Sequence, residues 1–380
     1  MHRRLVVATM LASALLTGCA SWFEGSSRPE PTRLAAFNPV QGLAERWSAS
    51  LGDSGTGGFM PAYHNGNIVA ADARGQVREF DATTGRQVRQ LDAGRPLTGA
   101  VGVSEELLLL GTAKGSLIAL ERRTGTVRWE QRLTSLTLEA PVVSGGQVMV
   151  RTNDGRITAF GLADGQQRWT YAASQPLLTL RNTGSMTPVG TEALIIGQAG
   201  GRIAVLAQES GALLWEATVA TARGATELER VTDVTSRPAF DNGQVCAVAY
   251  QGRVACFEAR SGTLQWARDI SSSQGLTLDE RNVYVTADDG SVQAFDRSTG
   301  RNLWKLDALR YRSVSGPAML GRFVLVTDQE GYAHLLSNET GAIVGRTRIG
   351  ADLLATQPQS LGENVLLQGR NGRLAMLTLK

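Results

Sequence analysis

Short apolar runs followed by turn residues recur along residues 43–380. Val148-Met149-Val150 and Val324-Leu325-Val326 are two such runs, and each is followed by a turn that ends in glycine. A segment of alternating apolar and polar residues comes next, as in Val292 and Ala294. This pattern is typical of antiparallel strands joined by tight turns. Because no amphipathic helix of ten residues or more separates the runs, the pattern excludes a parallel βαβ repeat.

The apolar runs belong to an internal repeat. An anchor glycine is followed five positions later by Phe or Leu, ten positions later by a second glycine and, in five copies, fourteen positions later by Trp. The anchors are Gly75, Gly115, Gly155, Gly201, Gly252, Gly290, Gly331 and Gly372. The five tryptophans are Trp129, Trp169, Trp215, Trp266 and Trp304. A period of about 40 residues with four short strands is the signature of a β-propeller blade.

The ends of the chain complete one repeat between them. The eighth copy ends at Lys380 after its third strand, and the missing fourth strand resembles residues 45–51, which contain Trp47. We therefore predict an all-β, eight-bladed β-propeller over residues 43–380, with four antiparallel strands per blade. Residues 43–51 are expected to complete the last blade and close the ring, which removes two exposed edges.

Six tryptophans occupy one position of the repeat, and this favours a packing role between neighbouring blades over ligand binding. Two blades depart from the pattern, with Arg89 in the first and Gly345 in the seventh. We expect looser packing at those two junctions because the large side chain is missing.

Composition excludes several classes of function. The net charge of +3 is too small to indicate a nucleic-acid partner, and we expect none. Three cysteines and three scattered histidines provide neither a disulfide framework nor a metal site. Cys246 and Cys256 flank a turn in the fifth blade, and both a disulfide and two buried thiols are compatible with their spacing.

The N-terminus has the features of an export signal. Residues 2–4 are basic or polar, residues 5–16 form a short apolar run, and the run ends in Leu16-Thr17-Gly18-Cys19. This ending resembles the lipobox of bacterial lipoproteins, which implies cleavage of residues 1–18 and acylation (palmitate) of Cys19. Ala20, which is not the aspartate of inner-membrane retention signals, favours the outer membrane. Residues 19–42 are expected to form a lipidated flexible tether.

The repeat itself resembles a known family. The pattern Ala-x-Asp-x-x-Thr-Gly-x-x-x-Trp at residues 294–304 is similar to the docking motif of quinoprotein (PQQ) dehydrogenases, which are eight-bladed propellers. That resemblance implies, as an alternative function, a periplasmic PQQ-dependent dehydrogenase. The chain lacks the adjacent cysteines of those enzymes and a metal-spaced cluster, so no enzyme activity, cofactor or metal is expected.

The lipobox, the tether and eight blades without cofactor ligands together resemble the BamB family, lipoproteins of the outer-membrane β-barrel assembly (BAM) machinery. The resemblance spans the whole chain. It implies a scaffold on the periplasmic side of the outer membrane that binds the POTRA domains of BamA and promotes insertion of β-barrel proteins. Unfolded outer-membrane proteins are a second candidate partner.

The spacing of the repeats indicates where a partner binds. Extra residues fall only before the fourth and fifth blades, at 170–188 and 216–237, and insertions in repeat proteins collect on a binding face. The family's Leu-x-Leu-Arg contact motif falls on Leu178, Leu180 and Arg181, and its acidic pair falls on Asp233 and Thr235, so the second acid is missing. Alternatively, the two leucines pack the loop on the fourth blade, with Arg181 paired to an acid such as Asp233.

Overall fold

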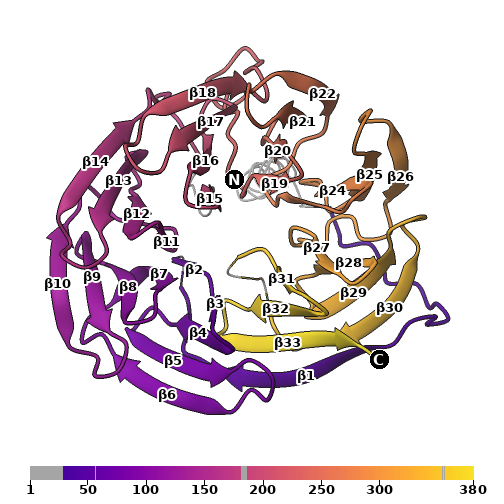
Figure 1. The fold of residues 1–380 in the computed structure, drawn as a ribbon. Coiled ribbons are helices and arrows are strands. Elements are labelled where there is room, and N and C mark those ends of the chain that lie inside the picture. Colours follow the sequence, from indigo (N-terminus) through magenta and orange to yellow (C-terminus); the bar gives the residue numbers. More distant parts are fainter. Residues whose placement is uncertain (1–28, 56, 181–185, 353, 355) are drawn as a thin grey trace, which may run out of the picture. The chain divides into compact units, whose positions relative to one another are not determined.

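The computed structural model describes residues 29–55, 57–180, 186–352, 354 and 356–380. The chain divides into two compact units, residues 1–31 and 32–380. In the second unit, eight antiparallel sheets are arranged radially around an axis, as Figure 1 shows. The predicted eight-bladed β-propeller is therefore confirmed. Among the described residues, no helix is long and apolar enough to cross a membrane.

In every blade but the second, the strand nearest the axis is the shortest, and in every blade but the eighth, the strand at the rim comes last in the chain. The first four blades consist of β3 (Ala62–His64), β4 (Asn67–Ala71), β5 (Gln76–Asp81) and β6 (Gln87–Asp92); β7 (Leu97–Val103), β8 (Leu107–Thr112), β9 (Ser116–Glu121) and β10 (Val127–Arg132); β11 (Val142–Ser144), β12 (Gln147–Arg151), β13 (Arg156–Gly161) and β14 (Gln167–Ala172); and β15 (Met186–Val189), β16 (Ala193–Gln198), β17 (Arg202–Ala207) and β18 (Leu213–Thr218). The short strand β2 (Gly58–Phe59) adds to the second blade, parallel to β7.

The other four blades repeat this order. They consist of β19 (Ala239–Asp241), β20 (Gln244–Val248), β21 (Arg253–Glu258) and β22 (Leu264–Asp269); β23 (Leu276–Leu278), β24 (Asn282–Thr286), β25 (Val292–Asp296) and β26 (Asn302–Leu306); β27 (Ala318–Leu320), β28 (Phe323–Thr327), β29 (Tyr332–Ser337) and β30 (Ile343–Arg348); and β31 (Gln359–Leu361), β32 (Asn364–Gln368), β33 (Arg373–Leu379) and β1 (Leu43–Ser50). The middle strands are almost wholly buried, because both of their faces pack against neighbouring blades.

The eighth blade joins the two ends of the propeller unit. Strand β1 pairs antiparallel with β33, and the register runs from Leu43 opposite Leu379 to Ser50 opposite Arg373. Arg373 also donates to the carboxylate of Glu45 across the closing pair. The predicted closure of the ring by the N-terminal strand is confirmed, and its strand pairs lie more than 300 residues apart in the chain.

The six tryptophans join neighbouring blades, as predicted. Each indole Nε1 donates to a backbone carbonyl of the next blade at 2.7–3.0 Å; the pairs are Trp47 with Ala82, Trp129 with Leu162, Trp169 with Gln208, Trp215 with Ala259, Trp266 with Arg297, and Trp304 with Asn338. Each indole ring also covers the second glycine of the next blade's repeat. A Cβ on Gly300 would lie 2.5 Å from the ring of Trp266, so the contact requires glycine.

The two junctions without tryptophan are filled by other groups, so the prediction of looser packing there is wrong. At the first, Arg89 Nη1 donates to the carbonyl of Arg122 at 2.5 Å, the equivalent of the indole bond. At the second, the chain before β1 takes the space, because a Cβ on Gly345 would lie 2.7 Å from the carbonyl oxygen of Gln41. The backbone N–H groups of Val40 and Gln41 both donate to Val344.

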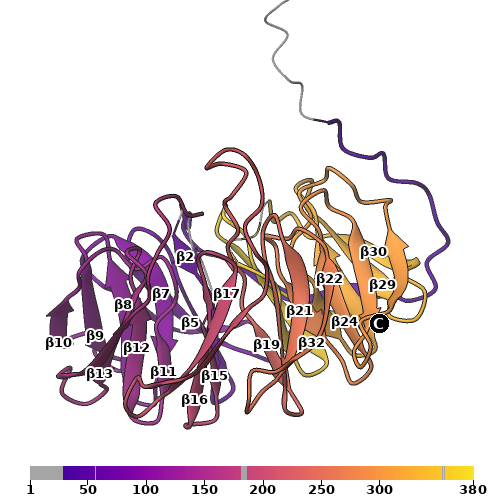
Figure 2. The same cartoon turned by 90° about the horizontal axis from the view of Figure 1, so that it is seen from above.

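We call residues 32–42 the strap, because they follow the outer edge of the seventh blade before entering β1 (Figure 2). The N–H of Thr32 donates to the carbonyl of Arg310, which lies in the connection between the sixth and seventh blades. Leu34 packs on the core of these blades. The strap belongs to the stretch assigned from the sequence to the tether. Cys19 and the predicted leader lie outside the described residues.

The fifth blade carries a disulfide between Cys246 and Cys256, whose Cα atoms are 4.1 Å apart. The two residues lie directly opposite each other on β20 and β21, and both side chains are buried. Of the two states compatible with the sequence, the structure thus contains the disulfide.

The tryptophan contact predicts unequal effects of two similar substitutions. Gly300 (φ +68°) and Gly243 (φ +74°) both have left-handed backbone, but a Cβ on Gly243 would meet nothing within 4 Å. Gly243→Ala should therefore cost only the backbone strain of about 1–2 kcal/mol. Gly300→Ala should cost roughly 1–3 kcal/mol more, because it also displaces Trp266. The free energies of unfolding in denaturant test this, and equal costs would contradict a role of the indole–glycine contact.

Candidate interaction site

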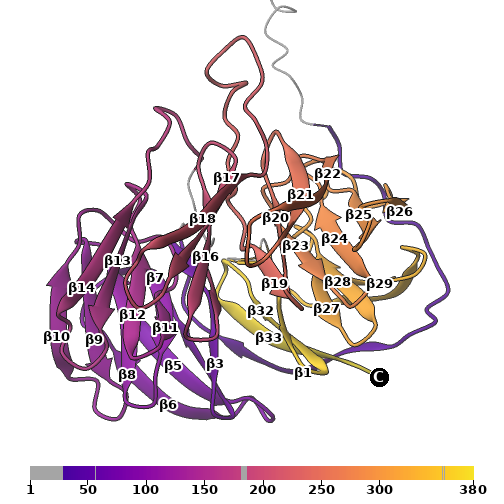
Figure 3. The same cartoon turned by 45° about the horizontal axis from the view of Figure 1, so that its top comes forward.

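Two long blade-to-blade connections stand on one face of the propeller, as Figure 3 shows. The first joins β14 to β15 and the second joins β18 to β19. To within one residue, both lie inside the insertions that the repeat spacing revealed at 170–188 and 216–237. Because connections between blades run outside the sheets, extra residues there extend the loops without disturbing the ring. We call them the first loop (residues 173–180, as far as it is described) and the second loop (residues 219–238).

Asp233 ties the two loops together. Its side chain is 3% exposed, and its carboxylate accepts the N–H of Leu180 at 2.6 Å and the N–H of Gly200 at 2.9 Å. Its carbonyl accepts the N–H of Tyr250 at 2.9 Å. One buried carboxylate thus holds the first loop, the fourth blade and the second loop in a fixed arrangement. Such a charged acceptor between backbone N–H groups is a strong interaction.

The loops expose apolar side chains. Leu177 is fully exposed, Leu178 is 40% exposed, and Leu228 at the tip of the second loop is 71% exposed. Leu180 is half-buried, as expected for a residue whose backbone is held by Asp233. Arg181 lies outside the described residues. Exposed leucines on a braced loop have the character of anchors at a protein interface.

The tip of the second loop is braced from within. Glu229 Oε2 accepts the N–H groups of Ala225 and Thr226 at 2.7 and 3.1 Å, and these bonds hold the pKa of Glu229 below its usual range. Arg230 Nε donates to the carbonyl of Gly224 at 3.0 Å. The turn therefore presents Leu228 on a local scaffold of its own.

Leu177 and Leu228 were not predicted as contact residues from the sequence, although both lie in the insertions that the repeat spacing revealed. An apolar residue inside a polar insertion is a usable signal, but the sequence does not show which leucines of a loop point to solvent. Asp233 and Thr235 were predicted from the family's acidic pair. Both are buried, so their side chains shape the site from beneath.

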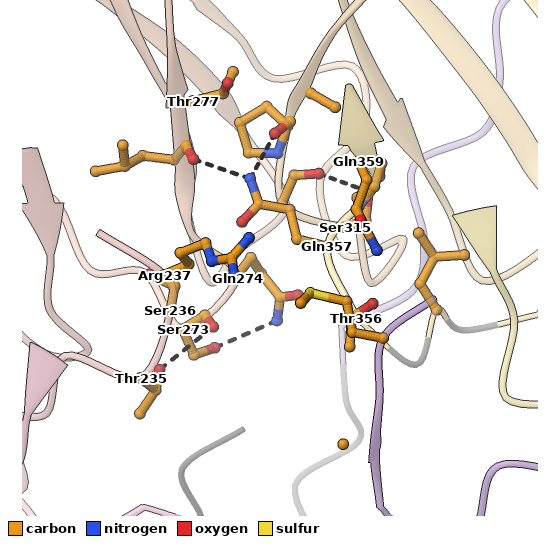
Figure 4. Close-up of a pocket in the computed structure, with 18 of the residues that line it drawn as sticks. Thr235, Ser236, Arg237, Ser273, Gln274, Thr277, Ser315, Thr356, Gln357 and Gln359 are labelled. Carbon is orange, nitrogen blue, oxygen red and sulfur yellow. Dashed lines mark hydrogen bonds between the residues drawn. The ribbon is translucent and has the colours of Figure 1, made fainter. Parts of the chain in front are cut away.

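A cavity of about 630 Å³ lies on the propeller axis, lined by the inner ends of the blades. Figure 4 shows its polar wall, where Arg237 faces the amide of Gln357. Arg237 Nε donates to the carbonyl of Met186 at 3.1 Å, and the surrounding protein lowers the pKa of Arg237 by desolvation, opposed by the carboxylate of Glu139. Although protein surrounds this guanidinium, the open cavity leaves it accessible to water.

The cavity does not fit the quinone and metal of the quinoprotein dehydrogenases. In the described part of the chain, no three His, Cys, Asp or Glu side chains come together to hold a metal ion. Serine, threonine and glutamine make up most of the polar wall, and its charged residues are Glu139, Arg237, Asp328 and Arg370. Cys246 and Cys256 lie in the core of the fifth blade, away from the wall.

The role of Asp233 can be tested within the free protein. In Asp233→Asn, one of the two N–H groups now bound to the carboxylate would face an amide NH₂, which cannot accept it. We expect a loss of about 1–3 kcal/mol and much faster hydrogen exchange at the amide that loses its acceptor, either that of Leu180 or that of Gly200. Glu229→Gln is the matched control in the second loop and should leave both amides unchanged. Equal protection of both amides in the wild type and Asp233→Asn would contradict the bracing role.

Comparison with known proteins supports the resemblance seen in the sequence. A family model described as outer membrane protein assembly factor BamB matches residues 73–306 and 288–380. The BamB of Bordetella pertussis is 37% identical over 377 residues, which cover 99% of this chain and 96% of the relative. The crystal structure of BamB from Moraxella catarrhalis superposes with a TM-score of 0.81 at 29% identity, covering 88% of this chain and 99% of the other.

A quinohemoprotein alcohol dehydrogenase from Comamonas testosteroni also superposes, with a TM-score of 0.69 at 13% identity, covering 88% of this chain and 76% of that enzyme. This likeness concerns the propeller fold alone. The family model, the full-length relative and the superposition on a BamB crystal structure lead to one conclusion: the chain belongs to the BamB family of outer membrane protein assembly factors.

Proposed function

We propose that this chain is a non-catalytic scaffold lipoprotein of the BAM complex that binds the periplasmic POTRA domains of BamA through its first and second loops. Its relatives are named as assembly factors and carry no enzyme name, and this agrees with the expected lack of catalysis. The binding role goes further than those names, and the geometry of the loops supports it.

The observation that carries the proposal is the display of Leu177, Leu178 and Leu228 on one face, held from beneath by the buried carboxylate of Asp233. An interface whose loops are fixed before binding loses less conformational entropy on association. Leu178, Leu180, Arg181 and Asp233 are the positions at which the family's contact motif falls. We assign direct contact to Leu178 and Arg181, and we assign positioning of the loop to Leu180 and Asp233.

The same proposal places the protein on the periplasmic side of the outer membrane, anchored by a lipid on Cys19 after removal of residues 1–18. The strap supports this arrangement, because Thr32 enters the propeller at the connection that contains Arg310. That connection joins two blades, as the first and second loops do, so Thr32 at the start of the strap lies on the same face of the propeller as those loops.

Binding of the full chain in detergent to the POTRA segment of BamA tests the site. Leu177→Asp combined with Leu178→Asp should weaken binding by about thirtyfold or more, the loss expected for an interface hot spot of roughly 2 kcal/mol. Arg181→Ala should have a similar effect. Leu213→Asp with Leu214→Asp is the matched control, because these leucines are 50% and 57% exposed on the rim strand β18.

If the loop variants bind as tightly as the wild type, the assigned site is wrong. If the rim variants lose binding equally, the partner recognises exposed leucine in general and the assignment to the loops fails. Binding of an unfolded outer-membrane protein by the same panel of variants would show whether that second candidate partner uses the same face.

A further inference from the structure

The seventh blade contains a buried charged cluster that binding at the loops does not require. His334 on β29 and Asp328 are fully buried, and Arg312 is 2% exposed. Asp328 Oδ2 lies 2.9 Å from His334 Nε2 and accepts the N–H of Arg312 Nε at 2.8 Å. Buried ionisable groups of this kind are costly unless each one has partners.

The partners of His334 define its protonation state. Arg346 on β30 donates from Nε to His334 Nδ1 at 3.1 Å. A guanidinium has no acceptor, so Nδ1 must carry the lone pair and the ring proton must be on Nε2, which points at Asp328. His334 is therefore neutral in this arrangement, and its neutral form is the only one that can receive the Arg346 bond.

Arg346 connects this histidine to the strap. Its Nη1 donates to the carbonyl of Ala35 at 3.2 Å, and its guanidinium lies 4.9 Å above the ring of Phe37. Arg312, the other cation of the cluster, donates from Nη1 to the carbonyl of Thr32 at 3.0 Å. The charged cluster thus holds residues 32–37, while the bonds of Val40 and Gln41 to Val344 hold the remainder.

We propose that His334 is a proton-operated latch for the strap. A proton taken from solvent onto Nδ1 removes the lone pair that Arg346 uses and places two N–H donors and two cations against each other. Arg346 then leaves this position, and its bond to Ala35 and its contact with Phe37 go with it. Residues 35–37 then lose their side-chain contacts with the seventh blade and become mobile, while Thr32 stays bound to Arg310 and Arg312.

The surrounding groups fix the direction of the response. Burial is the largest influence on the pKa of His334 and lowers it, Arg346 and Arg312 lower it further, and Asp328 opposes them. Asp328 stays ionised: burial opposes this, but hydrogen bonds from His334 and Arg312 keep the pKa of Asp328 below its usual range.

Other charged and titratable groups lie at the margin of the cluster. Glu330 accepts from Arg312, the ring of Tyr332 lies beside His334, and Arg348 lies over that ring. Because the pKa of His334 is lowered in the folded state, the latch is closed at neutral pH. It opens only as the pH falls through a value below the ordinary 6.5 of histidine.

A nitroxide label at position 36 can follow the strap. The full chain in detergent would carry Cys19→Ser and Ala36→Cys. The introduced thiol is then the only one that the label can modify, because Cys246 and Cys256 form a disulfide. We expect a restricted label at pH 8 and a mobile one at pH 5. His334→Gln, whose amide imitates the neutral ring but does not titrate, should keep the label restricted at both pH values. Arg346→Ala should leave it mobile at both.

Two controls separate the latch from other acid effects. His64→Gln removes a histidine of the first blade that pairs with Glu105 of the second blade. This variant should leave the pH-dependent change in label mobility unaltered. A label at Lys114→Cys, far from the strap in the second blade, should show no change if the ring stays folded. If the wild-type label is equally mobile at both pH values, or if His334→Gln keeps the transition, the latch does not exist.

A measurement on the unsubstituted side chain avoids any folding defect of the variants. With nitrogen-15 in the histidine rings, His334 should show an unprotonated Nδ1 at pH 8, and its protonation should coincide with the release of the label. Protonation of His334 without movement of the strap, or a protonated Nδ1 at pH 8, would overturn the proposal. Neither result depends on whether BamA binds the loops.

Discussion

The propeller depends on one contact that is made again at almost every junction, an indole from one blade lying on a glycine of the next. The indole Nε1 satisfies a carbonyl at the end of a strand, and its ring covers a backbone that has no side chain. The same glycine also provides the left-handed turn into the rim strand, so one residue serves the hairpin and the junction together. Local turn chemistry and packing between blades are therefore specified at the same position, which favours a single register.

The two junctions that lack tryptophan show how far this contact can be varied. Arg89 keeps the hydrogen bond and replaces the ring with a guanidinium close to Glu79. Gly345 provides neither the hydrogen bond nor the ring, and the backbone of Gln41 occupies the space that a side chain would fill. The second exception is the more consequential one, because it lets the chain before β1 lie along the seventh blade and places it within reach of Arg346. The strap therefore binds at the one repeat position, Gly345, where the tryptophan is replaced by a residue without a side chain.

The fold could be predicted from the sequence almost completely, because the repeat carries it. Each copy has its own turn glycines and junction residue at fixed spacing. The roles of Trp266 and Gly300 in packing between blades can therefore be predicted from their position in the repeat alone. Closure by β1 followed for the same reason. The packing at Arg89 and Gly345 did not follow, since the residues that fill those slots lie outside the repeat, and spacing alone says nothing about what enters an empty position.

The sequence predicted which loops form the site, but it did not predict which of their side chains are buried and which are exposed. Repeat spacing identified the two insertions, and the family motif selected Leu178 and Asp233, yet neither source shows that Asp233 is buried beneath the loop or that Leu177 is fully exposed. Those properties arise from contacts between segments about 50 residues apart, such as the bond from Leu180 to Asp233.

The cluster around His334 could not be predicted from the repeat pattern, because its residues come from four separate segments of the chain. The repeats determine the propeller ring. The residues that depart from the repeat form the segments added to it, which are the two loops on one face and the strap along the outer edge. A scaffold needs this division, since binding residues can change without altering the junctions that keep the ring closed.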